Sequence, residues 1–299
     1  MVKIEYQGTD ITDSVTVTRC WIDQYAEEHG DTIKIIFNDV DGLWDSWGPS
    51  VGDKIRVYNG NIDSGIQYVR RVHPTVGRFE IDASAIPPTA GGEKKKEWKQ
   101  ITKLQLANDI AGKCGLSLKT YGLKDCIFKN LKQDYEEDLK FFQKLCMVEG
   151  DAFLVYNGQM VLYNESYMEN QSPAETIGLD MDNYPEYWDK RVIPALKIRN
   201  DSMSYTYGSG SPVKGIYVPL YIDSQGTAEK YAKNLLHYYD KMKKGGFFYY
   251  RSPLDDGYAA GSVAEIKTDN RPSYDGKAFI YHVRFDTDDN RAKVFFRCL

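Results

Sequence analysis

Several residues of this sequence stand at spacings that catalytic sites use. Ser211 and Lys214 have the S-x-x-K spacing of a serine nucleophile and its lysine base. That spacing arises often by chance, and the G-x-S-x-G turn of serine hydrolases is absent from the sequence. The surrounding run GSGSPVKG is no phosphate-binding loop, because Val213 replaces the third glycine and the G-K-[ST] ending is missing. We therefore predict a surface loop here.

Acidic residues near the end of the sequence imitate the start of a calcium-binding loop. Asp286, Asp288 and Asn290 have the required spacing. However, Arg291 replaces the glycine that makes the sharp turn, and Arg297 stands in place of the bidentate glutamate. The run predicts a capped turn rather than an ion site.

The remaining candidate metal ligands give no better site. An acidic run that leads directly into Pro185 predicts another capped turn, and it consists of Asp180, Asp182 and Asn183. The four histidines show no ligand spacing, and they are His29, His73, His237 and His282. His237 falls within a predicted helix, where a structural role is favoured, and His282 alternates with strand neighbours. The sequence predicts no metal, no cofactor and no catalytic residue.

Two other functions stay open. A glycosidase needs a pair of carboxylates, and nothing selects a pair among the 43 acidic residues. Trp44 and Trp47 in GLWDSWGPS would suit a sugar ring in a carbohydrate- or receptor-binding module. The favoured interpretation is that they anchor a turn or fill an interface.

Composition indicates which partners to expect. The net charge of −5 gives no reason to expect specific nucleic-acid binding, which usually needs a basic face. No run reaches the length of a membrane span, and the first residues lack an apolar signal core, so we expect a soluble protein without membrane insertion. The odd number and wide spacing of the cysteines favour reduced thiols in a cytoplasm, and these are Cys20, Cys114, Cys126, Cys146 and Cys298.

Residues 1 to about 90 predict a β domain. Short runs rich in Val, Ile, Tyr and Phe alternate with glycine turns, which is typical of a barrel or sandwich. Pro87-Pro88 closes this region. The following TAGGEKKKE predicts a connection, with Lys94 to Lys96 as part of a solvated linker.

Residues 95 to 170 predict a small α+β domain. Thr102 and Gln105 have the spacing of a capping box, at the start of a helix that ends at Gly115. A second helix is predicted to be capped by Asp134, with Glu137 three residues on, and to end at Gly150.

A β-hairpin is predicted directly after this second helix. AFLVYNGQMVLY reads as two strands joined by Asn157-Gly158, the pair that best suits a type I′ turn.

Residues 171 to 299 predict a second β-rich domain, with a connecting segment at 171 to 190. One helix, TAEKYAKNLLHYYDKMKKGG, interrupts the strands and is expected to stop at Gly245-Gly246. Strand-like runs follow one another in the same order in the two β-rich regions. An internal duplication is as plausible from this pattern as its absence.

The order of elements in the middle of the chain resembles the late control D or tail-hub family of contractile phage tails, which also includes hubs of phage tail-like bacteriocins and relatives in type VI secretion spikes. The resemblance lies in WKQITKLQLANDIAGKCGLSL (98–118) and QDYEEDLKFFQKLCMVEGDAFLVYNGQMVLY (133–163). Within them, the matching features are Leu106-Ala107, Ile110-Ala111, Gly115-Leu116, Gln133, Asp138-Leu139, Phe142, Leu145, Glu149-Gly150 and Asn157-Gly158.

The resemblance implies a mainly β fold in which two tube-like β-barrel domains flank a small α/β domain, with one helix in the second barrel domain. It also implies a non-enzymatic homotrimer in the baseplate of a virion or tail-like particle, assembled in the bacterial cytoplasm. The implied partners are the tail tube protein, the spike protein, other baseplate proteins and the tape measure protein. A cell-wall hydrolase and a glycan-binding module are the alternatives.

Overall fold

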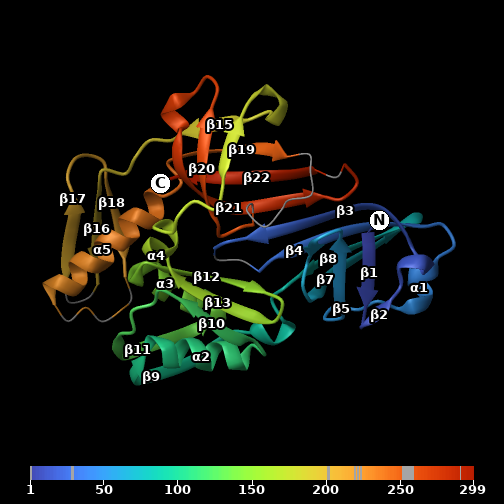
Figure 1. Cartoon of the computed structure of the whole chain (residues 1–299). Helices are drawn as coiled ribbons and strands as arrows, with labels where there is room; N and C mark the ends of the chain where they lie inside the picture. The colour runs from blue at the N-terminus through green and yellow to red at the C-terminus, as the bar shows by residue number, and fades with distance from the viewer. Residues whose placement is uncertain are drawn as a thin grey trace.

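The computed structural model describes residues 2–27, 30–200, 203–218, 220, 222, 224–250, 259–289 and 291–299. The candidate ligands His29 and Asn290 lie outside this description, as do residues 251–254 of the strand-like run FFYYRSPL (247–254). About half of the described chain is β-strand, arranged around one large sheet with smaller α/β layers beside it (Figure 1).

The large sheet has fourteen strands, drawn from both ends of the sequence. From the first part come β1 (Val2–Tyr6), β2 (Thr9–Asp10), β3 (Thr16–Tyr25), β4 (Thr32–Asp39), β5 (Lys54–Asn59), β6 (Ile62–Asp63), β7 (Gln67–Thr75) and β8 (Gly77–Ser84). From the last part come β14 (Thr176–Leu179), β15 (Glu186–Asp189), β19 (Lys244–Tyr250), β20 (Val263–Thr268), β21 (Gly276–Asp286) and β22 (Arg291–Cys298).

The two halves of this sheet repeat the same strand order. In the first half the order is β3-β4-β8-β7-β5-β1, and in the second it is β15-β19-β22-β21-β20-β14. Each of these six strands therefore has a counterpart at the same place in the order of the other half, while β2 and β6 have none. One difference is that β1 and β5 are antiparallel, whereas β14 and β20 are parallel. The agreement is what an internal duplication predicts, while closure of each half into a barrel stays a prediction.

The halves are joined through one long strand. The first residues of β21 pair with β20, and its last residues pair with β3, where His282 lies opposite Tyr25 and Asp286 opposite Trp21. One hydrophobic core spans this joint, because buried Phe37 of β4 and Phe296 of β22 belong to the same cluster.

The segment between the halves forms the expected small α+β unit with its own core. Its elements are β9 (Lys94–Thr102), α2 (Lys103–Lys113), β10 (Ser117–Tyr121), β11 (Ile127–Glu136), α3 (Asp138–Glu149), β12 (Asp151–Tyr156), β13 (Gln159–Asn164) and α4 (Glu165–Glu169). The capping box of Thr102 and Gln105 is present, and Gly150 ends α3 in the left-handed conformation. The hairpin is also confirmed, since Asn157 and Gly158 have φ of 44° and 74°.

Two predictions for this unit were wrong. Lys94 to Lys96 begin strand β9, which pairs with β11, so they are not a linker. Asp134 does not cap α3, because it lies within β11 and Glu137 occupies the N-cap position. The long-range pairing of β9 with β11 outweighs the local capping signal.

A further layer contains β16 (Ala195–Arg199), β17 (Ser204–Gly208), β18 (Val213–Tyr217) and α5 (Gln225–Asp240). The helix expected in the second β-rich part, α5, packs on this small sheet and on α3. It ends before the predicted stop, because Gly245 and Gly246 lie in β19. A Cβ atom added to Gly245 would lie 2.3 Å from the carbonyl oxygen of Phe296, so glycine is needed there for close strand packing.

Candidate functional site: a buried ionic junction

The residues that matched enzyme motifs do not converge. Ser211 is exposed, and the ammonium of Lys214 lies 3.3 Å from the centre of the Tyr239 ring. The Asp180 carboxylate accepts a hydrogen bond from the Asp182 backbone N–H, so this run caps a turn as predicted. Asp286 accepts hydrogen bonds from the Trp21 indole and from a neighbouring backbone N–H. Among the described residues, no cluster of three or more His, Cys, Asp or Glu side chains is arranged to hold a metal ion.

The two tryptophans differ in burial: Trp44 packs in the main hydrophobic core, whereas Trp47 is 37% exposed. Trp44 is the second residue of the short helix α1 (Leu43–Trp47) and is only 1% exposed. Its ring stacks on Phe79 at 5.3 Å and meets the edge of Trp47 at 5.1 Å. Because its faces are buried, Trp44 has no surface on which a sugar ring can stack.

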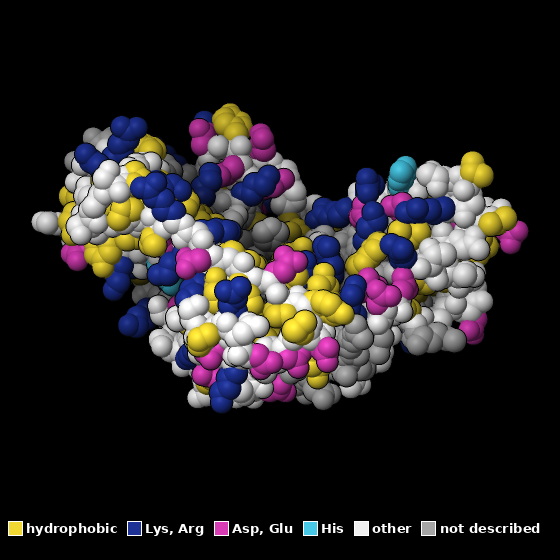
Figure 2. Space-filling view, turned by 90° about the horizontal axis from the view of Figure 1, so that it is seen from above, with side chains coloured by type: hydrophobic (Ala, Val, Ile, Leu, Met, Phe, Trp, Pro, Cys, Tyr) yellow, Lys and Arg dark blue, Asp and Glu magenta, His cyan; other side chains and the backbone are white. Residues whose placement is uncertain are grey.

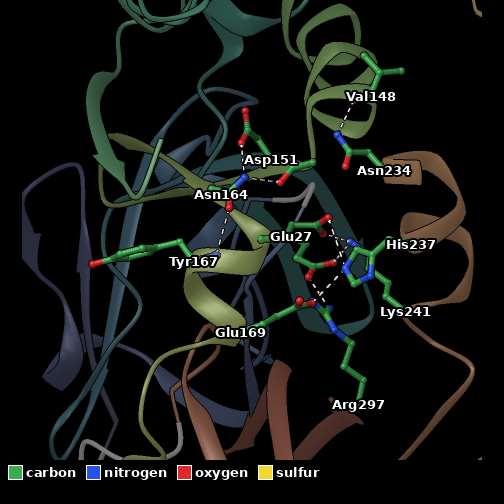
Figure 3. A network of polar contacts seen from close by, with 12 residues as sticks. Glu27, Val148, Asp151, Asn164, Tyr167, Glu169, Asn234, His237, Lys241 and Arg297 are labelled. Atoms are coloured by element: carbon green, nitrogen blue, oxygen red, sulfur yellow. Dashed lines mark hydrogen bonds and ion pairs between the residues drawn. The ribbon is translucent and has the colours of Figure 1, made fainter. Parts of the chain in front are cut away.

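Charged side chains, all but His237 largely buried, gather where the parts of the chain meet, and they form what we call the ionic junction. It contains Glu27, Glu165, Glu169, His237, Lys241 and Arg297 (Figure 3). Glu27 follows β3, the other two glutamates belong to α4, the histidine and lysine belong to the end of α5, and the arginine comes from β22. The junction therefore connects both halves of the large sheet, the α+β unit and the α5 layer.

Helix spacing places four of these residues. Glu165 and Glu169 are four residues apart on α4, and His237 and Lys241 are four residues apart at the end of α5, so each pair shares a helix face. The short helix α4 is held by Asn164, whose side chain accepts a hydrogen bond from the Tyr167 backbone N–H and donates to the carbonyl of Gly150 (Figure 3).

Arg297 is the centre of the junction. Its side chain is 1% exposed, and its two terminal nitrogens donate to Glu27 and, at 3.0 Å, to Glu169. Lys241 is 5% exposed and pairs with both Glu27 and Glu165. Each of these cations bridges two carboxylates from different parts of the chain.

The positive and negative charges of the junction are nearly equal in number. Burial raises the pKa of Glu165, and Lys241 only partly offsets this effect. Burial also opposes ionisation of Glu27, but Arg297 and Lys241 outweigh it and lower its pKa. A hydrogen bond to Glu169 at 3.2 Å raises the pKa of His237. When His237 is protonated, three cations face three carboxylates.

A second buried ion pair lies inside the α+β unit. Lys103 is 3% exposed and pairs with Asp151, while Glu149 binds Lys230 of α5 at 2.6 Å. Burial lowers the pKa of Lys103, but Asp151 outweighs it and the net direction is upward. These carboxylates are held by cations from neighbouring elements, which favours a structural role.

Neutral contacts also join the first half of the sheet to the α+β unit. The Tyr163 hydroxyl donates to the carbonyl of Ala26 at 2.7 Å. The Asp31 backbone N–H donates to the carbonyl of Val155 at 3.1 Å. The buried Asp31 carboxylate accepts from the Tyr25 backbone N–H at 2.9 Å, and burial raises its pKa to about 8. The two parts therefore form a continuous hydrogen-bonded joint.

Sequence reasoning did not find the ionic junction. In the sequence, Arg297 stands out only because it does not fit a calcium loop, and Lys241 only as part of the predicted helix TAEKYAKNLLHYYDKMKKGG. The spacing of Glu165 with Glu169 and of His237 with Lys241 was visible, but no local signal says that the two helices face each other.

The described part of the chain contains no helix with the length and apolar character needed to cross a membrane. No protein-family model matches the sequence, and neither does any curated protein.

Solved structures match over almost the whole chain. The tail protein from Neisseria meningitidis MC58 matches with a TM-score of 0.76 at 12% identity, over 99% of this chain and 96% of its own. The 43 kDa tail protein of prophage MuSo2 from Shewanella oneidensis matches with a TM-score of 0.76 at 13% identity, over 99% and 97%. The E. coli c3393 protein is described as a type VI secretion component with structural similarity to the T4 tail proteins gp27 and gp5. It matches with a TM-score of 0.62 at 11% identity, over 98% of this chain and 76% of its own.

At these identities the similarity concerns the fold, and at that level it confirms the predicted resemblance to the tail-hub family. The chain has the mainly β fold of these phage tail proteins.

Proposed function

We propose that this chain is a structural hub of a contractile phage tail or phage tail-like particle. Three copies form a ring that joins the six-fold tail tube to the three-fold spike. Each copy supplies two tube-like β-barrel units, residues 1–90 and 171–299, and the α+β unit at residues 95–170 lies outside the ring.

One observation carries this proposal, namely the strand order shared by the two halves of the large sheet. Two similar units in each of three chains give six similar units, which can meet a six-fold tube. The same ring keeps the three-fold symmetry of its chains on the side of the spike. The match to tail proteins over nearly the whole chain supports the same assignment.

The ionic junction supports a mechanical role. An adaptor must keep its two β units at a fixed relative position, since an error in one unit would break the ring. Arg297 and Lys241 are buried and bind carboxylates from several parts of the chain. Removing one partner of a buried ion pair strongly destabilises a fold, because the other charge is left buried and unpaired. The proposed partners are the tube protein, the spike protein, other baseplate proteins and the tape measure protein. The hub acts by binding them and carries out no chemical step.

Two measurements on the purified chain test the proposal. Sedimentation equilibrium over a range of concentrations should give a species of three copies, alone or with the spike protein. Incubation with peptidoglycan should release no soluble fragments. A chain that stays monomeric in the presence of tube and spike proteins, or that releases wall fragments, contradicts the hub function.

A further inference from the structure

The outer end of the first half of the sheet carries two neighbouring exposed valines. Val40 follows the last residue of β4, Val76 precedes β8, and their exposed fractions are 76% and 106%. Asp39 and Gly77 pair across the two strands, so the valines extend from the same end of that pairing. A single exposed valine is ordinary, but two at one tip form an apolar knob.

Two exposed carboxylates lie close to Val40 in the sequence. Asp41 follows Val40, and Asp45 lies in α1; both are exposed. No ion pair among the described residues includes either of them. Hydrophobic side chains project from the right-hand margin of the molecule in Figure 2, with acidic side chains beside them. We call Val40, Asp41, Asp45 and Val76 the valine tip.

An apolar cavity of about 300 Å³ lies between α3, β18 and α5. Its walls are formed by Phe141, Leu145, Val148, Ile216, Val218 and Leu235. Lys132 lines it beside Glu136 and Lys144, which form an ion pair with each other, and Lys214 reaches over the ring of Tyr239, which also lines it. Across the described residues, neither Lys132 nor Lys214 takes part in an ion pair. Figure 1 shows these elements on the opposite side of the molecule from α1.

We propose that the valine tip of one copy of this chain inserts into the lysine-rimmed cavity of a second copy. The valines enter the apolar space, and Asp41 and Asp45 face Lys132 and Lys214. Two unpaired carboxylates thus meet two unpaired ammonium groups, which is the complementarity that fixes an interface in one register.

The geometry has a consequence for assembly. Because the tip and the cavity lie on different faces of each copy, the contact is heterologous and passes from copy to copy. A heterologous contact closes into a ring when its rotation suits a small number of copies. This inference rests on the proposed function, since it names the surfaces through which the three copies of the hub bind each other. Because α3 of the α+β unit forms part of the cavity, this contact would lie on the outer side of the ring.

Charge exchange tests the interface. One variant carries Asp41→Lys and Asp45→Lys, and another carries Lys132→Glu and Lys214→Glu. Because like charges then face each other, each variant should weaken self-association by at least about tenfold. A chain carrying all four substitutions should regain it, and far-ultraviolet circular dichroism checks that every variant is folded. The double variant Val40→Ser, Val76→Ser should weaken self-association by the same factor at low and at high salt concentration.

The outcomes separate this interface from the hub function. If all charge variants form the same three-copy species as the unchanged chain, the interface is wrong while the hub function stands. If the two pairs weaken association but the fourfold variant does not restore it, the proposed pairing is also wrong. If the unchanged chain does not self-associate under any condition, both proposals are wrong.

Discussion

Glu27 and Arg297 are 270 residues apart in the sequence, yet their side chains form a buried ion pair. The pair connects the loop after β3 to the last strand of the sheet. Glu169 of α4 binds the same guanidinium, so one arginine holds three parts of the chain together.

Replacing Arg297 by Met should lower the free energy of unfolding by about 3–5 kcal/mol, because it leaves buried carboxylates without their cation. Urea denaturation followed by tryptophan fluorescence measures the change. The matched control is Arg71→Met, since Arg71 is 59% exposed and its pair with Asp82 is at the surface. That control should cost less than about 1 kcal/mol. Equal losses in the two variants would mean that the junction does not stabilise the fold.

His237 should make stability depend on pH. Its pKa is raised above 6.5 by the hydrogen bond to Glu169, although burial and Arg297 oppose the shift. A raised pKa means that the folded state prefers the protonated form. The contribution is therefore complete below pH 6.5 and is lost as the pH rises through the folded-state value.

Thermal unfolding over about pH 6 to 9 tests this, because the range covers the titration of histidine. His237→Gln should lose that part of the pH dependence, whereas His73→Gln, at an exposed position, should keep it. The neighbouring groups that also titrate or carry charge are Glu165, Glu169, Lys241 and Arg297. A His237→Gln profile that parallels the unchanged chain would assign the slope to one of those groups instead.

Asp31→Asn should stabilise the protein at neutral pH. Burial raises the pKa of Asp31 from 3.8 to about 8, so its ionised form is unfavourable in the folded state. This cost grows as the pH rises from 3.8 toward about 8. The Asn side chain is neutral and can still accept from the Tyr25 backbone N–H, so the gain near pH 7 should be about 1–3 kcal/mol.

Urea denaturation at several pH values measures this gain, which should shrink as the pH falls toward 4. Asp134→Asn is the control, because the Asp134 side chain is 71% exposed and should show no such trend. A destabilised Asp31→Asn variant at neutral pH would mean that the ionised carboxylate is bound in the folded protein.

Two glycines near α5 should respond in opposite directions to alanine. Gly226 lies in the first turn of α5, and an added Cβ would meet nothing closer than 3.9 Å. Gly226→Ala should therefore stabilise the protein by about 0.5–1 kcal/mol. At Gly246 the added Cβ would lie 2.5 Å from the carbonyl oxygen of Glu186, so Gly246→Ala should destabilise by about 1–3 kcal/mol. The order of the two melting temperatures checks the placement of Gly246 in β19 rather than at a helix end.

The parts of the fold that the sequence predicted are those with local signals. Thr102 and Gln105 satisfy each other within one helical turn, and Asn157-Gly158 supplies both positive φ angles of a hairpin. Such features depend on a few adjacent residues, so no tertiary information is needed to see them.

The parts that the sequence did not predict depend on distant pairing. Strand β9 begins with Lys94 to Lys96 and gains its structure from β11, about thirty residues later. Strands β14 and β15, in the segment expected to be a connection, have only four residues each, so any alternation within them is a weak signal. The ionic junction depends most on distant contacts, since no sequence pattern near Glu27 indicates that it pairs with Arg297.

The most direct test of the account is a reconstruction of the purified chain by single-particle electron microscopy. If the chain is a hub, the reconstruction should show a closed ring of three copies. Strands β1–β8 of one copy should alternate around the axis with β14, β15 and β19–β22 of the next, as six similar units. Particles of a single copy, or an assembly in which the two halves of the sheet do not occupy equivalent positions, would contradict it.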